Sequence, residues 1–376
     1  MVKDKKTEHK ELDVSKFVSD LIAEYRNKDI TVDNGKVGCS FIDTGNLALN
    51  YIMSGSFDYG LPEGQVTEIH GDPSTGKSLL LYNIISNFQK KYPSGVVILD
   101  DTENAYVEYL GSTLEIDENR LIKLSSSTVE EHANVIALGG KVPIRKGDKF
   151  EEIDIGVPLL TKLLKSGIDK ILVAVDSIAV LSTKHEFDVG LDKPDMSKAK
   201  TLKALLRLMT PIIKKHNVTY IVTNHLIFVI GSLIPNMKVT PGGGGVVYQS
   251  SVRLGLSPAG KLKMKNTNTV TGVISKVTTV KNRFAPPFRT CKLEIMFNKG
   301  MSRYSGLISL LTNLGVIKLG NGGWYEVLGR EMKFQSKELP EIWEKLREVI
   351  SSKDILQREG EDVISQEADE DKSLSI

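Results

Sequence analysis

The chain has 376 residues, of which 40% are hydrophobic and 26% are charged, and its formal net charge is +2 at pH 7. These values are typical of an ordinary soluble globular protein with one large domain or two modest ones. Cys39 and Cys291 lie far apart and form no metal-ligand spacing, which indicates a reducing compartment, and we expect the cytoplasm. The sequence contains no apolar stretch of membrane-spanning length, and residues 1–10 lack the apolar core of a signal peptide.

The two ends of the chain carry opposite charge. Residues 1–10 are basic, whereas 358–372 are strongly acidic. Such an acidic end is usually a disordered, solvating tail. The alternative is a nucleic-acid mimic that competes for a basic groove.

Residues 11–26 predict an amphipathic helix, because their apolar residues recur at helical spacing on one face. A polar, glycine-containing stretch follows. We therefore expect an appended helix that docks on this core or on a neighbouring subunit. The apolar face consists of Val14, Phe17, Val18, Leu21, Ile22 and Tyr25.

The central region predicts an α/β fold with a mostly parallel sheet. Continuous Val/Ile/Leu runs suit strands that helices cover on both faces. Beyond residue 245 the segments 246–256, 271–282 and 290–298 are typical of antiparallel strands, which would extend that sheet. The four apolar runs are 65–71, 95–101, 170–177 and 218–224.

The last part of the chain predicts a small separate region. Residues 304–356 look helical at both ends, with a glycine-rich turn and Trp324–Tyr325 between them. The predicted division is an N-terminal helix and linker (1–36), an α/β core (37–303), a small C-terminal region (304–357) and an acidic disordered tail (358–376).

The segment GDPSTGKS at 71–78 fits the pattern G-x-x-x-x-G-K-[ST] between a predicted strand and a predicted helix, the context that this motif requires. Its N–H groups and the helix N-terminus can cradle phosphate oxygens. Lys77 then reaches the β- and γ-phosphates of ATP, and Ser78 offers a hydroxyl to Mg²⁺. The alternative is a chance glycine-rich turn. The predicted nucleotide-binding residues are Gly71, Asp72, Pro73, Ser74, Thr75, Gly76, Lys77, Ser78 and Leu79.

Two other predicted strands end in carboxylates. Asp176 follows ILVAV, and a carboxylate there can hold magnesium through water. Asp101 and Glu103 follow VVIL, and one of them can orient an attacking water as general base. The alternative for each is an ordinary strand end with solvated acids. Because parallel strands bring their carboxyl ends to one edge of the sheet, the joint occurrence with the phosphate loop favours a nucleotide site.

A helix is predicted over 196–216, and Lys200, Lys203 and Arg207 share one of its faces. That face either contacts nucleic-acid phosphates or is simply solvated, and spacing alone favours the second reading. A polar pair, Asn224 and His225, ends the strand at 218–224. It either hydrogen-bonds a γ-phosphate or its water, or is a satisfied structural pair.

Residues 226–245 show no convincing secondary structure, and a loop of that length is usually functional or mobile. Its apolar side chains, among them Phe228 and Met237, can wedge between bases. The alternative is that LIFVI forms another buried strand. Four glycines at 242–245 end the loop. They suit close backbone approach to nucleic acid and large φ/ψ changes, or they form a linker without function.

Several segments together resemble the RecA family of recombinases, and most closely its phage members of the UvsX type. FIDTGNLALNYIMSG and GLPEGQVTEIHGDPSTGKS are similar to the start of the RecA core. KAKTLKALLRLMTPI, IVTNH and GGWYE are similar to UvsX-type segments, and VKNRFAPPF is similar to the stretch after RecA's second DNA loop. The likeness covers roughly residues 37–330 and is specific as a set, although the phosphate-loop motif alone is shared by many ATPases.

The resemblance implies roles for individual residues. Glu103 would activate the water and Asp176 would serve Mg²⁺, while His225 stands where RecA itself has glutamine. Tyr109 would stack on adenine. Lys281 and Arg283 would act on the γ-phosphate of a neighbouring subunit.

The resemblance also implies how DNA is bound. Residues 185–192 match the first DNA loop and 226–243 the second, and the basic helix face matches DNA contacts. Two parts depart from the family: residues 139–156 look like an insertion, and the C-terminal region is not recognisably RecA's DNA-gathering domain. The implied DNA-binding residues are Lys198, Lys200, Arg207, Phe228, Met237, Gly242, Gly243 and Gly244.

The function that this resemblance implies is ATP-dependent DNA strand exchange. Subunits would form a helical filament on single-stranded DNA and pair it with homologous duplex, with a loading mediator and a single-strand-binding protein as partners. A phage protein of this kind would act in the cytoplasm of a bacterial host. The rival interpretations are a ring-forming helicase of the same fold, a non-catalytic accessory protein, and a small-molecule P-loop kinase.

Overall fold

The computed structural model describes residues 16, 18–20, 23–24, 39–146, 149–189, 197–229 and 237–351. Internal contacts divide the chain into two units, Met1–Ser40 and Phe41–Ile376. The described residues between 16 and 24 are helical, in agreement with the predicted N-terminal helix. The rest of that helix, with five of its six predicted apolar residues, lies outside the described residues, as does the acidic end.

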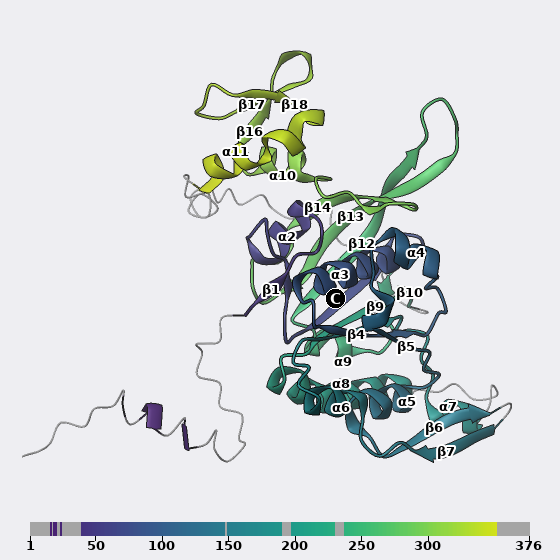
Figure 1. The fold of residues 1–376 in the computed structure, drawn as a ribbon. Helices are drawn as coiled ribbons and strands as arrows, with labels where there is room; N and C mark the ends of the chain where they lie inside the picture. The colour runs from purple at the N-terminus through teal and green to yellow at the C-terminus, as the bar shows by residue number, and fades with distance from the viewer. Residues whose placement is uncertain are drawn as a thin grey trace, which may run out of the picture. The chain divides into compact units, whose positions relative to one another are not determined.

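A nine-stranded sheet forms the centre of the second unit (Figure 1), with the order β15-β14-β13-β12-β3-β9-β8-β4-β5. The strands from β12 to β5 run parallel, and β13, β14 and β15 extend the sheet in antiparallel fashion. The mostly parallel sheet predicted from the apolar runs is therefore confirmed, whereas β5 was not predicted. The strands are β3 Val66–Gly71, β4 Val96–Asp101, β5 Leu121–Leu124, β8 Ile171–Asp176, β9 Thr219–Asn224, β12 Val252–Lys263, β13 Val270–Asn282, β14 Thr290–Met296 and β15 Gly300–Met301.

Helices cover both faces of this sheet. Alternate residues of a strand point to opposite sides, so a strand of continuous apolar residues has two apolar faces to bury. On β4, Val97 and Leu99 pack in one core cluster and Ile98 in the other. The first cluster includes α2 Leu47–Ser54 and α3 Lys77–Lys91. The second includes α5 Val129–Ala133, the π-helical segment η2 Asn134–Leu138, α6 Leu159–Lys165, α8 Ser197–Lys215 and α9 Gly244–Gln249.

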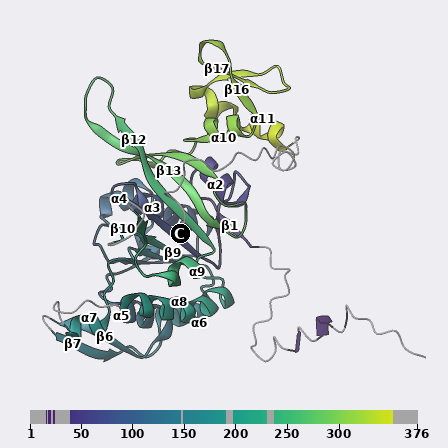
Figure 2. The same ribbon diagram turned by 180° about the vertical axis from the view of Figure 1, so that it is seen from behind.

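Smaller elements complete the unit, and Figure 2 shows them from behind. The segment predicted as an insertion forms an antiparallel hairpin, β6 and β7. Among the described helices, none is long and apolar enough to cross a membrane. The remaining elements are β1 Phe41–Ile42, β2 Leu61–Pro62, α4 Glu108–Thr113, η1 Glu118–Arg120, β6 Lys141–Lys146, β7 Lys149–Asp154, α7 Lys184–Val189, β10 Ile227–Phe228 and β11 Lys238–Val239.

The C-terminal region is more than two helices. The helices α10 Leu307–Asn313 and α11 Leu339–Ser351 are present as predicted. Between them lies a three-stranded antiparallel sheet rather than a simple turn, and Trp324–Tyr325 begins its central strand. Its elements are β16 Ile317–Leu319, η3 Asn321–Gly323, β17 Trp324–Val327, β18 Lys333–Gln335 and η4 Ser336–Glu338.

The glycine run leads into a helix, and its predicted close approach to nucleic acid stays a prediction. The residues after it form α9, not the strand predicted from residue 246, and β12 begins only at Val252. Gly242 and Gly243 have φ values of 94° and 59°, which glycine adopts without strain. A Cβ on Gly245 would lie 2.7 Å from the Cα of Lys203 in α8. Within the described part of the chain, these glycines let α9 pack closely against α8.

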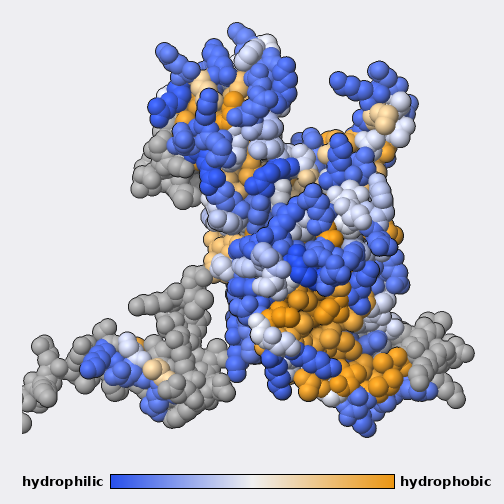
Figure 3. All heavy atoms as spheres, viewed as in Figure 1, coloured by the Kyte–Doolittle hydropathy of each residue, from blue (hydrophilic) through white to orange (hydrophobic). Residues whose placement is uncertain are grey.

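One face of the second unit is apolar. Figure 3 shows a broad hydrophobic area in the region of α5, α6 and β5. Leu138 at the end of η2 and Val157 shortly before α6 are exposed apolar side chains, at 41% and 40% exposure, and Leu159, Leu163 and Leu164 of α6 are partly buried. An apolar area of this kind on a monomer commonly marks an interaction surface.

Candidate nucleotide-binding site

The phosphate loop joins β3 to α3, and its shape requires glycine at two positions. A Cβ on Gly71 would lie 2.3 Å from the carbonyl oxygen of Leu256, and one on Gly76 would lie 2.6 Å from Ile295 Cδ1. Gly76 also has a φ of 83°. The loop is thereby fixed against β12 and β14, and it leads directly into a helix of 15 residues. The positive end of that helix favours anions.

Lys77 lies in the floor of this loop. Its side chain is buried, and its Nζ donates to the carbonyl oxygens of Gly71 (3.1 Å) and Asp72 (3.0 Å). Burial lowers the pKa of Lys77, while Glu103, Asp176 and Asp72 raise it. The Lys77 ammonium group and the N-terminus of α3 meet in a loop that has no room for a Cβ at Gly71 or Gly76. The loop therefore fits the phosphates of a nucleotide.

Ser78 and Asp176 lie next to each other at the same edge of the sheet. Asp176 accepts hydrogen bonds from Thr223 (2.6 Å), Tyr82 (3.1 Å) and Ser78. Burial raises the pKa of Asp176, and the hydrogen bonds from Thr223 and Ser78 lower it. In the described part of the chain, no group of three or more His, Cys, Asp or Glu side chains could hold a metal. Mg²⁺ needs none, because it binds through one or two carboxylates plus phosphates and water.

Glu103 and His225 meet across the end of the sheet. His225 Nε2 lies 2.6 Å from Glu103 Oε1, and both side chains are about 30% exposed. Asp101 accepts the N–H groups of Ala105 (3.0 Å) and Tyr106 (2.8 Å) and so holds the turn that carries Glu103. A carboxylate paired with an imidazole beside a phosphate loop can orient and deprotonate a water.

These groups line one open depression of about 360 Å³. The structure thus brings together the strand ends that the sequence pattern linked. It also adds two apolar residues that sequence reasoning missed, Val273 on β13 and Phe297 just after β14. Both residues reach the depression because β13 pairs with β14. No pattern in the sequence indicates that pairing. The predicted residues in the lining are Pro73, Ser74, Gly76, Lys77, Ser78, Leu79, Glu103, Asp176 and His225.

Tyr109 lies on α4 with 70% of its surface exposed. It is not among the described residues that line the depression. Phe297, which is 49% exposed, is the aromatic ring in that lining. The assignment of Tyr109 to adenine therefore stays a prediction.

Lys281 and Arg283 lie at the opposite edge of the sheet. Lys281 lies opposite Arg253 in the strand register, and Arg253 lies opposite Glu68 on β3, which is three steps or roughly 10 Å from Gly71 at about 3.3 Å per residue. The N–H of Arg283 donates to the carbonyl oxygen of Ser251, whose own N–H donates to Val66 at the start of β3, five steps or roughly 16 Å from Gly71. Lys281 Nζ donates to the carbonyl oxygens of Val247 and Tyr248, both at 2.9 Å. In this chain neither cation lines the phosphate-loop depression.

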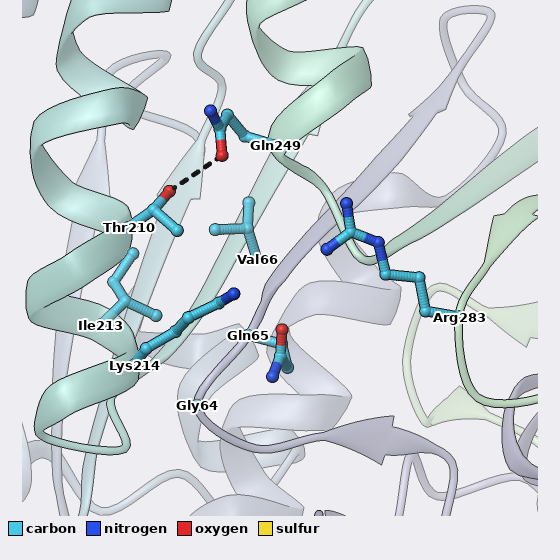
Figure 4. A pocket seen from close by; sticks show the side chains of 8 residues that line it. All are labelled: Gly64, Gln65, Val66, Thr210, Ile213, Lys214, Gln249 and Arg283. Atoms are coloured by element: carbon cyan, nitrogen blue, oxygen red, sulfur yellow. Dashed lines mark hydrogen bonds between the residues drawn. The ribbon is translucent and has the colours of Figure 1, made fainter. Parts of the chain in front are cut away.

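A small hollow lies at this opposite edge (Figure 4). Figure 4 shows Lys214 from α8 and Arg283 with their charged groups directed toward it. Thr210 and Gln249 close one side through a hydrogen bond of 3.4 Å. The edge of the sheet away from the phosphate loop is thus cationic.

The predicted DNA-binding residues come from several elements, and their role stays a prediction. Lys198 donates to the carbonyl oxygen of Ala179, and burial lowers its pKa. Lys200 and Arg207 are exposed on α8, and Phe228 is 61% exposed on β10. The β10–β11 pair holds both ends of the second predicted DNA loop, so the expectation of no secondary structure over 226–245 is wrong at its flanks. Residues 190–196 and 230–236 lie outside the described residues.

A glycine-rich phosphate loop, with the Ser78–Asp176 and Glu103–His225 pairs beside it at the carboxyl edge of a mixed α/β sheet, defines a P-loop nucleotide-binding protein. Comparison with known proteins is consistent with that class. The model of the RecA N-terminal domain family matches residues 149–302.

Full-length relatives extend this match. The RecA protein of Bacteroides thetaiotaomicron is 30% identical over 318 residues, which cover 82% of this chain and 86% of the relative. RecA of Methylococcus capsulatus is 31% identical, with 80% of each chain covered, and RecA of Thermus aquaticus is 30% identical, with 83% and 85% covered. The chain belongs to the RecA family. Its closeness to UvsX-type phage members stays a prediction.

Proposed function

We propose that this chain is an ATP-dependent recombinase that forms filaments on single-stranded DNA and exchanges strands with homologous duplex. The observation that carries the proposal is the division of charged groups between the two edges of the sheet. The phosphate loop and Glu103 lie at one edge, while Lys281 and Arg283 lie at the other. A second copy would bring the two sets together over one nucleotide.

ATP would supply the γ-phosphoryl group, and Mg²⁺ would neutralise charge on the phosphates. Lys77 and the N–H groups of the phosphate loop would hold the phosphates, and Ser78 and Asp176 would hold the metal. Glu103 accepts the proton of the attacking water, while His225 keeps Glu103 in position through the hydrogen bond of 2.6 Å. Water adds to the γ-phosphorus as the bond to the ADP oxygen breaks. Phe297 and Val273 provide an apolar wall for the base.

The neighbouring subunit completes the reaction. Its Lys281 and Arg283 would neutralise charge that develops on the γ-phosphoryl oxygens. A cation supplied in trans in this way raises the rate of phosphoryl transfer by about 10³–10⁵. The N-terminal helix would pack on the neighbouring subunit. The apolar area of Figure 3 gives the assembly a second contact surface. Nucleotide binding and polymer assembly would then depend on each other.

DNA would bind through the exposed face of α8 and the second loop. Lys200 and Arg207 contact phosphates, and Phe228 presents an aromatic ring to the bases. Base pairing rather than side chains supplies sequence recognition. A loading mediator and a single-strand-binding protein are the expected partners. A UvsX-type role would place the protein in the cytoplasm of a bacterial host.

Mixing two inactive variants tests this proposal. Lys281→Ala and Glu103→Ala each lose ATP turnover, and an equal mixture with single-stranded DNA regains part of it, because a Lys281→Ala pocket is completed by a Glu103→Ala neighbour. The matched control replaces Lys281→Ala with Lys318→Ala, a surface lysine of the C-terminal sheet, which stays active alone. A mixture that stays inactive contradicts catalysis shared between chains. Absence of filaments in electron micrographs with ATP and DNA contradicts the proposed function.

A further inference from the structure

Lys238 contacts two parts of the molecule at once. It lies on β11, directly opposite Phe228 of β10. Its ammonium group lies 2.6 Å from Oδ1 of Asp72 in the phosphate loop and 4.9 Å from the centre of the Phe228 ring. One cation therefore joins the phosphate loop to an exposed aromatic ring at the base of the second loop.

Asp72 passes this contact on to the nucleotide-binding lysine. Its side chain receives Lys238, and its main-chain carbonyl oxygen receives Lys77 Nζ at 3.0 Å. Thr75 Oγ1 donates to the same carbonyl oxygen at 2.8 Å. A change in the position of Lys238 would therefore move the side chain of Asp72 and, with it, the carbonyl oxygen that accepts from Lys77 and Thr75.

The arm that carries Lys238 is also anchored a few residues further on. Arg253 donates to Thr240 Oγ1 at 3.3 Å, and Asn224 donates to the carbonyl oxygen of Pro241 at 3.2 Å. Asn224 Oδ1 accepts the N–H of His225 at 2.9 Å. One end of the segment 238–241 therefore contacts the phosphate loop, and the other contacts Asn224, the residue next to His225.

A buried carboxylate fixes this anchor. Glu68 is fully buried, accepts a hydrogen bond of 2.8 Å from Asn224, and forms an ion pair with Arg253. A buried ion pair that loses one partner leaves a costly unpaired charge, so the anchor is rigid. The Lys238–Asp72 pair is about 31% exposed at both side chains. It is the adjustable end of the segment.

We propose that Lys238 is a positioning residue that couples DNA bound at Phe228 of β10 to nucleotide on the phosphate loop through its contact with Asp72. The inference rests on the proposed function. A base that stacks on Phe228, or a DNA phosphate beside it, competes with Asp72 for the ammonium group. The altered Asp72 then changes how the loop presents Lys77 to the phosphates.

A double-mutant cycle on the full chain tests this inference, with Lys238→Gln, Asp72→Asn and the double variant. Two ratios are measured: the affinity for a non-hydrolysable ATP analogue with and without an oligodeoxythymidine strand, and the affinity for that strand with and without the analogue. Coupling between two binding sites is reciprocal. Both ratios are expected to fall together by about two- to fivefold, as suits an exposed ion pair. The double variant should lose no more than either single one.

Lys333→Gln is the matched control, because it removes an exposed lysine paired with Glu326 in the C-terminal sheet and should leave both ratios unchanged. Wild-type ratios in Lys238→Gln would overturn the inference, as would losses that add up in the double variant. If the nucleotide affinity of the wild-type protein is the same with and without the DNA strand, the proposed function is overturned, and this inference with it.

Discussion

The two edges of the central sheet differ in chemistry although the same strands build both. At the carboxyl edge, β3, β4, β8 and β9 deliver a phosphate loop, two carboxylates and an imidazole into one depression. At the amino edge, the end of β13 and the helix α8 deliver Lys281, Arg283 and Lys214. The comparison teaches that the fold keeps these cations apart from the phosphate loop of the same chain, as the proposed sharing of one site between two copies requires.

Removing a cation from the amino edge should have the largest effect. We expect Lys281→Met to lower DNA-stimulated ATP turnover by about 10³–10⁵, the worth of a cation supplied in trans. Nucleotide binding to dilute, unassembled protein should stay unchanged, because Lys281 does not line that chain's own depression. Lys276→Met, an exposed lysine on the same strand, is the control for turnover. Equal loss in both variants would end the contrast between the edges.

Removing the base at the carboxyl edge should have the next largest effect. Glu103→Gln keeps the shape of the side chain but cannot accept the proton, and turnover should fall by about 10²–10⁴. Binding of an ATP analogue and assembly on DNA should persist. Single-turnover hydrolysis and electron microscopy measure the two properties. Turnover within tenfold of wild type would mean that another group deprotonates the water.

Acid should destabilise the carboxyl edge through His70. Burial lowers the pKa of His70 to about 4, although Glu68 raises it. As the pH falls, the unfolded chain therefore binds a proton at this histidine before the folded chain does. The contribution of neutral His70 to the free energy of unfolding is complete above about pH 6.5 and is lost as the pH falls toward 4. This change from 6.5 to about 4 corresponds to at most about 3 kcal/mol.

His70→Gln should remove that dependence, as urea unfolding at several pH values would measure. His216, which follows α8 toward the amino edge, is the comparison. Burial and Lys215 lower its pKa as well, but it is less buried, and His216→Gln should change the slope less. A larger effect of His216→Gln would reverse the comparison.

The smallest expected effect concerns the base of the nucleotide. Phe297→Ala removes the aromatic ring from the lining of the depression and should raise the KM for ATP by about tenfold, as suits the loss of an aromatic contact. Tyr109→Ala should change KM less than twofold, because Tyr109 is 70% exposed outside that lining. Steady-state kinetics measure the KM for ATP of both variants. A larger increase in Tyr109→Ala than in Phe297→Ala would mean that adenine stacks on Tyr109.

Sequence patterns were sufficient where function depends on local order along the chain. The phosphate loop is one continuous segment, and buried parallel strands require continuous apolar runs. The rule that such strands end at one edge then placed Asp176, Glu103 and His225 together. These parts of the fold and of the site followed from short-range information.

The parts that were not predicted depend on register between distant segments. Phe297 and Val273 reach the depression only because β14 pairs with β13 and lies against the phosphate loop. Residues 246–249 have an apolar, strand-like start but form a helix, since Gly245 allows close packing on α8. The Lys238–Asp72 contact spans 166 positions, and no periodicity indicates such a pair.

The separation of the phosphate loop from Lys281 and Arg283 has a consequence for the growth of the proposed filament. If copies join head to tail through these two surfaces, they form an open chain rather than a closed pair. The terminal copy at one extremity would then have a phosphate-loop pocket without its neighbour's cations, and the copy at the other would have cations with no nucleotide beside them. The two extremities would be chemically unlike, so addition and loss of subunits should have a direction along the DNA.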